Sequence, residues 1–186
     1  MLHTLRSRPA TAAPARDAVD LLMDCHQRIR AFTATAARLA DAHGAPPADV
    51  ASAAAGVRRY FTVAMPLHAA DEDDSVAPRL RASSAPPEVR DAVATIAAQH
   101  AVIDRLIESL AEGWQTLARD PSRLPVLSSR LAEGAARLGA VWSVHLSIEE
   151  EVVFPALRRW VEPEELARVV DEMSARRPAS AFTRVE

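Results

Sequence analysis

Apolar side chains recur along most of the chain at spacings of three and four residues, the period of a buried helix face. This repeat predicts a first long helix between Asp17 and Gly44, and a second that Asp49 could cap. The third run, residues 89–117, is the most regular, and the fourth begins near Leu124. No segment alternates with the period of two that is typical of strands. The pattern therefore predicts an all-α protein with four long helices.

Segments rich in proline, glycine and serine separate these helices, and such short connections place successive helices antiparallel. We expect an antiparallel up-down four-helix bundle over residues 15–162, a flexible arm at 1–14, and a short helix with a polar tail at 163–186. Pro66 lies inside the second run, so a bend or irregular turn is expected there. Pro78 and then the segment at residues 83–87 are expected to end that helix.

Each predicted helix carries one histidine on its apolar face, and these are His26, His68, His100 and His145. Glu72 lies four residues after the second of them and Glu149 four residues after the fourth, so each pair shares a helix face. At about 1.5 Å per residue along antiparallel helices, all four histidines fall within roughly one turn of each other. We therefore expect the six side chains in one buried layer.

Such a layer needs a partner, because an unpaired buried polar group costs about 1–3 kcal/mol. Six donors exceed the needs of one tetrahedral zinc, and mixed imidazole and carboxylate ligands favour a pair of iron ions, with manganese or zinc as substitutes. Two histidines per metal, two bridging glutamates and a solvent-derived bridge would leave one open position at each metal. The alternative is a purely structural bundle whose histidines are hydrogen-bonded core residues.

Neighbouring residues leave alternatives open. Glu150 could replace the preferred Glu149 as a ligand if the helix turns slightly. Asp104, one turn after the third histidine, is a weak ligand, a partner for that histidine or a solvated charge. The acidic run at 71–74 is expected to be a solvated face with only Glu72 turned inward.

Other reactive or bulky side chains have simpler interpretations. Cys25 adjoins the first histidine but points about 100° away on a helix, so we expect it to serve in packing. Trp114, Trp142 and Phe61 fall at core spacing and are expected in the core.

Composition narrows the functional class. The chain has 186 residues, of which 49% are hydrophobic and 25% charged, as in an ordinary globular domain. Its net charge of −3 provides no general attraction for nucleic acid or anionic membranes. With a single cysteine, no signal-peptide pattern and no run near the roughly 18 apolar residues of a membrane span, we expect a cytoplasmic protein.

The combined motif His26, His68-x-x-x-Glu72, His100, His145-x-x-x-Glu149 resembles the hemerythrin-like, HHE cation-binding domain family. The segments that follow the two glutamates, as far as residues 80 and 157, resemble that family as well. The resemblance covers roughly residues 17–160 and implies a non-haem di-iron site in a four-helix bundle. Oxygen-carrying hemerythrins have a further histidine where this chain has Asp104. Bacterial iron-centre repair proteins have a similar four-histidine set but an additional cysteine-bearing N-terminal segment.

Together these features predict a di-iron protein that binds or reacts with O2, NO or peroxide, as a sensor, store or detoxifier. The alternative is a di-iron enzyme that decomposes peroxide, reduces NO or oxidises a metabolite. Metabolite oxidation is the weaker alternative, because no segment indicates an organic substrate pocket. Binding and turnover both stay open at this point, and the oligomeric state is undetermined.

Overall fold

The structure, a computed structural model, describes residues 16–177. Within that range every regular element is helical and no strand is present, which confirms the all-α prediction. The predicted arm at 1–14 and the last part of the predicted tail, 178–186, lie outside the described residues. The α-helices are α1 Ala18–Ala40, α2 Pro47–Arg59, α3 Met65–Ala70, α4 Ala77–Ala82, α5 Pro87–Arg119, α6 Leu124–Ile148, α7 Phe154–Trp160 and α8 Pro163–Ala175. Three π-helical turns, η1 Tyr60–Ala64, η2 Asp71–Val76 and η4 Glu149–Val153, and one 3-10 turn, η3 Pro121–Arg123, complete the set.

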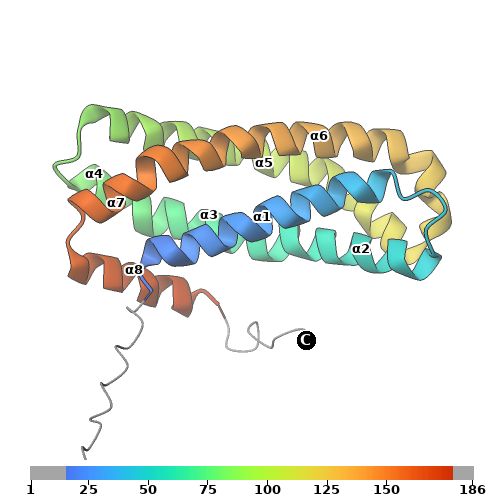
Figure 1. Cartoon of the computed structure of the whole chain (residues 1–186), viewed down its shortest axis with the longest axis horizontal. Helices are drawn as coiled ribbons and strands as arrows, with labels where there is room; N and C mark the ends of the chain where they lie inside the picture. Colours follow the sequence, from blue (N-terminus) through green and yellow to red (C-terminus); the bar gives the residue numbers. More distant parts are fainter. Residues whose placement is uncertain (1–15, 178–186) are drawn as a thin grey trace, which may run out of the picture.

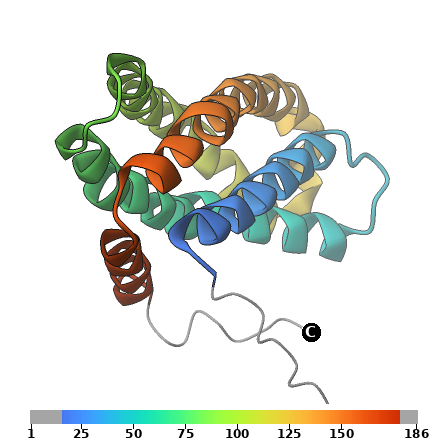
Figure 2. The ribbon, with the colours of Figure 1, turned by 60° about the vertical axis from the view of Figure 1, so that its left-hand side comes forward.

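Several elements follow one another without a break and form long helical stretches (Figure 1). One runs from α2 through η1, α3 and η2 to α4, and another from α6 through η4 to α7. With α1 and α5 they make four long stretches in the described part of the chain. α1 packs against α6 and α2, and α5 packs against the same two helices from the other side. The molecule is thus a helical bundle (Figures 1 and 2).

Local chemistry explains where the first helices begin and end. The Asp17 carboxylate accepts the Asp20 backbone N–H at 2.9 Å, and the Asp20 carboxylate accepts the Asp17 N–H at 3.1 Å, which caps α1. After α1 the chain turns at Gly44, whose φ of 84° is accessible at little cost only without a Cβ. α2 then begins at Pro47. Asp49 therefore lies in the first turn of α2 and is not its N-cap, although its charge there favours the helix dipole.

Three prolines lie within the long stretches, each just after a π turn: Pro66, Pro78 and Pro155. In each case the residue before the proline donates its N–H to the carbonyl five positions earlier: Met65 to Tyr60, Ala77 to Glu72, and Phe154 to Glu149. A proline ring clashes with the carbonyl four residues before it, and the wider turn accommodates that carbonyl. The irregular turn predicted at Pro66 is confirmed. The helix passes Pro78 and continues to Ala82, so Pro78 does not end it, whereas the predicted end at residues 83–87 is confirmed because Ser83 is the C-cap.

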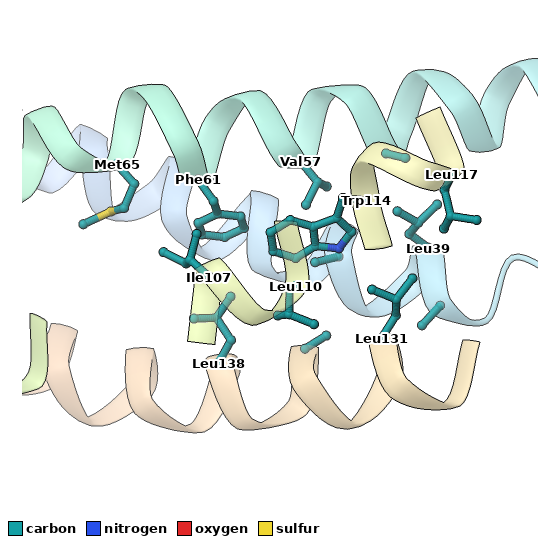
Figure 3. Close-up of a cluster of buried hydrophobic side chains, with 14 of the residues drawn as sticks. Leu39, Val57, Phe61, Met65, Ile107, Leu110, Trp114, Leu117, Leu131 and Leu138 are labelled. Carbon is teal, nitrogen blue, oxygen red and sulfur yellow. The ribbon is translucent and has the colours of Figure 1, made fainter. Parts of the chain in front are cut away.

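Two hydrophobic clusters fill the bundle, one toward each end. The larger contains Trp114, Trp142 and Phe61, as predicted, and Figure 3 shows Phe61 beside Trp114, with ring centroids 5.6 Å apart. The smaller lies where α4, α7 and α8 meet the start of α1. In α1, Leu22 belongs to the smaller cluster and Ile29 to the larger, so the histidines lie in a layer between two apolar regions.

α8 lies beside the end of the bundle that holds the smaller cluster (Figures 1 and 2). It buries Val169 and Met173 there and contacts η2, α1 and α7. The predicted short C-terminal helix is therefore part of the packed structure. Among residues 16–177, no helix combines the length and apolarity that a membrane span requires.

Candidate metal centre

All six side chains that the sequence singled out as metal ligands come together in the layer between the two hydrophobic clusters. Their donor atoms form two groups, and within each group all lie within 4.8 Å of one another. One group is His26, His68, Glu72 and Glu149; the other is Glu72, His100, His145 and Glu149. None of the six residues is more than 5% exposed. The two glutamates belong to both groups, which is the arrangement of carboxylates that bridge two metal ions.

One local pattern occurs twice in this cluster, at residues 68–78 and 145–155. In each copy a histidine is followed after four residues by a glutamate and after ten by a proline. The first spacing puts the histidine and glutamate on one helix face. The proline induces the π turn that contains the glutamate, and π turns of this kind often occur at functional sites.

Ring nitrogens and carboxylate oxygens face each other at short range in the cluster. Oε2 of Glu149 lies 3.1 Å from Nε2 of His26 and 3.4 Å from Nε2 of His145. Nε2 of His68 lies 3.0 Å from Oε1 of Glu72. None of these three pairs has hydrogen-bond geometry, so within the described part of the chain these buried atoms have no hydrogen-bond partner. A cation between them would satisfy nitrogen and oxygen lone pairs together, so this donor set fits a metal.

Three of the four histidines turn their other ring nitrogen, Nδ1, toward an oxygen atom. The pairs are His26 with Glu150 at 2.7 Å, His100 with Asp73 at 3.0 Å, and His145 with Gln99 at 3.0 Å. When Nδ1–H donates to that oxygen, Nε2 keeps its lone pair toward the cluster. This tautomer is the one that can bind a metal through Nε2.

Glu150 therefore has a place beside the cluster rather than in it. Its carboxylate accepts from His26 Nδ1 and also pairs with Arg30 at 2.9 Å, while Glu149 points into the centre. The geometry favours Glu149 of the two glutamates that the sequence left as alternatives.

Asp104 is exposed on α5, in agreement with the solvated alternative. The partner of His100 Nδ1 is instead Asp73, which follows Glu72 on η2. The sequence analysis missed both Asp73 and Gln99 as partners of histidines. Each lies on a different helical stretch from the histidine that it contacts, so no spacing along one helix could indicate the pair.

The expectation that only Glu72 of the acidic run 71–74 turns inward is wrong. Asp71 is fully buried, and its carboxylate accepts hydrogen bonds from Arg176, at 3.1 Å, and from Arg177. The π turn explains the difference, because a wider turn rotates successive residues by less than an α-helix and brings both neighbours to the interior. A buried carboxylate with two guanidinium partners is an ion pair of the core.

In the metal-free cluster, histidines and Glu72 shift one another's pKa values toward their charged forms. Burial alone would lower the pKa of His68, but Glu72, Cys25 and Glu149 together outweigh burial and raise that pKa well above its usual range. Burial would also lower the pKa of His100, but Glu72 and Asp73 outweigh burial and raise that pKa to about 9. Burial would raise the pKa of Glu72, but His68 and His100 hold it well below its usual range. In the absence of a metal, protons therefore supply the positive charge that the carboxylates need.

His68 differs from the other three histidines because, within residues 16–177, its Nδ1 has no hydrogen-bond partner. The Cys25 thiol, which is buried in α1 next to His26, contributes to the raised pKa of His68. Burial would raise the pKa of Cys25, but His68 and the cations Arg28 and Arg177 outweigh it and lower the pKa. Cys25 is buried as predicted, and it is also adjacent to the cluster.

A cavity of about 10 Å³ adjoins both shared carboxylates. Its lining is apolar apart from three acidic residues, and consists of Glu72, Asp73, Val76, Ala77, Val93, Ile96, Glu149 and Val153. A space of this size holds about one water-sized molecule. The cluster is therefore next to a small pocket suited to a ligand of two or three atoms.

Comparison with protein families identifies the family of the chain. Residues 17–157 match the hemerythrin family, described as the hemerythrin HHE cation binding domain. The matched region contains all six cluster residues and ends before α8. No curated protein matches the chain significantly.

Proposed function

The chain belongs to the hemerythrin HHE cation-binding family, and from this premise we propose that it is a non-haem di-iron protein. We propose that it binds or reacts with O2, NO or peroxide as a sensor, store or detoxifier. Its fold would be an antiparallel up-down four-helix bundle over residues 15–162, followed by a C-terminal helix and tail at 163–186. A cytoplasmic location would keep its single thiol, Cys25, reduced.

The observation that carries the proposal is that Glu72 and Glu149 belong to both groups of donor atoms. One metal would be held by His26 and His68, and the other by the remaining histidine pair, with both glutamates between them. Imidazole and carboxylate donors from facing helices are the ligands that di-iron centres in helical bundles use. Manganese or zinc could occupy the same donors.

Iron bound there would supply open coordination positions and one-electron redox chemistry for a small ligand. The chain would orient the ligand imidazoles and exclude larger molecules from the centre. With a metal bound, Glu150, Asp73 and Gln99 would each accept the Nδ1–H of one imidazole and leave its Nε2 lone pair for the metal. The valine- and isoleucine-lined cavity keeps bulk water and larger molecules away from the carboxylates.

Turnover is the second candidate. The cavity borders both Glu72 and Glu149, so a ligand that reaches one metal position is also close to the other. A pair of redox-active ions held by these residues would supply the two electrons needed for peroxide decomposition or NO reduction. A metabolite oxidase is disfavoured because about 10 Å³ leaves no room for an organic substrate.

Elemental analysis of the full chain, purified without added metal and again after anaerobic ferrous loading, tests the proposal. We expect about two iron ions per chain. His145→Ala should lose iron, whereas His43→Ala, a change at an exposed histidine outside the cluster, should keep it. Failure of the loaded wild-type chain to retain iron would overturn the di-iron proposal.

Ligand experiments on the iron-loaded protein then separate binding from turnover. A reversible adduct with O2 or NO, followed by its absorption spectrum, would support a sensor or store. Repeated loss of peroxide or NO without damage to the protein would support the enzyme. His43→Ala should behave as wild type in both assays.

A further inference from the structure

α8 lies outside the family-matched region, yet the chain just after it reaches the segment that carries Glu72. η2 packs against α8, and two successive arginines at the end of α8, Arg176 and Arg177, extend to Asp71. Asp71 is the immediate neighbour of Glu72 on η2. α8 thus has a direct polar connection to the metal centre.

Arg177 makes the closest part of this connection. Its guanidinium donates to both carboxylate oxygens of Asp71, and Nη1 also donates to the Met173 carbonyl at 2.6 Å. The second contact occupies one of the carbonyls left free at the C-terminal end of α8. The guanidinium of Arg177 therefore links the C-terminal end of α8 to η2.

Asp71 is fully buried and has two arginine partners, of which Arg177 contacts both carboxylate oxygens and Arg176 contacts Oδ1 alone. A buried carboxylate is tolerated when it is paired and hydrogen-bonded, and removing a partner is strongly destabilising. Loss of Arg177 would leave Oδ2 of Asp71 without its cation and would favour a rotation of η2 that turns Asp71 toward water. The same rotation would carry Glu72 out of the centre, because the two residues are adjacent in one π turn.

Arg79 forms a second link between η2 and α8. Arg79 donates to the Ser75 carbonyl at 2.9 Å and to both carboxylate oxygens of Glu172 on α8, at 3.1 and 2.8 Å. It also donates to Glu165 at 3.1 Å. η2 is thus tied to α8 near both of its ends.

We propose that Arg177 is a positioning residue, and that the docked end of α8 holds η2 in the conformation that directs Glu72 into the centre. The consequence for metal binding rests on the proposed function. The consequence for η2 does not, because it concerns the metal-free chain. α8 is on this basis an integral part of the site and not an appendage to the family domain.

Hydrogen–deuterium exchange of the full metal-free chain tests the first consequence. In Arg177→Ala the amides of η2 should lose protection, while those of η4, which carries Glu149, should not. The matched control is Arg158→Ala, which removes an arginine that pairs with Asp17 and Asp20 at the same end of the bundle and contacts no cluster residue. Equal protection of η2 in Arg177→Ala and Arg158→Ala would overturn the proposal.

Iron retention against a chelator tests the second consequence. Arg177→Ala should weaken retention by about 10- to 100-fold, and Arg158→Ala should leave it unchanged. Arg177→Lys, which keeps a charge but cannot bridge both oxygens of Asp71, should fall between wild type and Arg177→Ala. Unchanged retention in Arg177→Ala beside a wild type that binds iron would overturn the positioning role.

A double variant shows whether Arg177 acts through Asp71. Asp71→Asn removes the charge that needs the guanidinium, so adding Arg177→Ala to it should change η2 protection less than Arg177→Ala does alone. Full additivity would overturn the route through Asp71. If the wild-type chain binds no iron, the proposed function fails, while the exchange results still decide whether Arg177 positions η2.

Discussion

Glu72 and Glu149 occupy equivalent positions in two different helical stretches, each four residues after a histidine and six before a proline. The carbonyl of each accepts the N–H that closes a π turn, and the carboxylate of each belongs to both groups of donor atoms. One local pattern, used twice, thus places two carboxylates face to face. The shared position of these two side chains is the basis for the first prediction.

Glu72→Ala and Glu149→Ala should each abolish binding of both metals, because each carboxylate lies within reach of both histidine pairs. Elemental analysis after ferrous loading measures the result. Glu151→Ala is the control, since Glu151 is exposed and accepts only from Ser147. Full metal content in either cluster variant would show that the carboxylate is not a ligand.

Glu150→Ala should weaken metal binding without abolishing it. The change removes the acceptor of His26 Nδ1–H, and loss of such a partner lowers metal affinity by about 10- to 100-fold. Competition with a chelator measures the affinity. Asp104→Ala, at an exposed position on α5, should bind as wild type. Complete loss of metal in Glu150→Ala would instead make Glu150 a ligand.

The stability of the metal-free protein should fall as pH rises from about 6.5 to about 9. Folding raises the pKa of His100 to about 9 and also raises that of His68, so the folded chain binds more protons over this range. Their stabilisation is complete below the unfolded pKa and is lost as pH passes the folded pKa. Glu72 has the opposite effect in acid, because folding lowers its pKa. Its contribution to stability is complete above the usual glutamate pKa of 4.5 and is lost as pH falls below that value.

Bound metal should reverse the fall in stability between pH 6.5 and 9. A metal ion competes with the same histidine protons, so the extra stability that it provides should increase between pH 6.5 and 9. Thermal unfolding of metal-free and ferrous-loaded protein, measured anaerobically across this range, gives the two slopes. Parallel slopes would show that His68 and His100 do not exchange protons for metal.

Two glycines provide a paired test of the packing. A Cβ on Gly134 of α6 would lie 2.3 Å from Cδ2 of Leu110 on α5, so Gly134→Ala should destabilise the fold by about 1–3 kcal/mol. A Cβ on Gly56 of α2 meets nothing closer than Phe32, at 4.0 Å. Gly56→Ala should therefore stabilise the helix by about 0.5–1 kcal/mol. Denaturant unfolding measures both, and equal effects would contradict the close approach of α5 and α6.

The six cluster residues could be found from the sequence because they obey the same spacing as the core. Each histidine replaces an apolar residue on a helix face, as His26 does between Leu22 and Ile29. A polar residue on a periodic apolar face is visible without knowledge of neighbouring helices. The i to i+4 relation of His145 and Glu149 is likewise a property of one helix.

Other features depend on contacts between separate helices. Asp73 and Gln99 accept from histidines of neighbouring helices, so their role depends on how those helices pack. Pro78 does not end its helix, because a π turn of the preceding backbone accommodates the ring.

By itself, the sequence determined the helical class, the four apolar faces, the six-residue cluster and the family, since these depend on spacing along single helices. Only the tertiary structure showed that Glu150 contacts His26 from beside the cluster, that Asp104 is solvated and that Asp71 is buried. Asp71 is buried because Arg177, 106 residues away, provides its counter-charge. Burial of a charged side chain depends on the groups that pack against it. The spacing of residues along one helix cannot indicate a counter-charge so distant in the sequence.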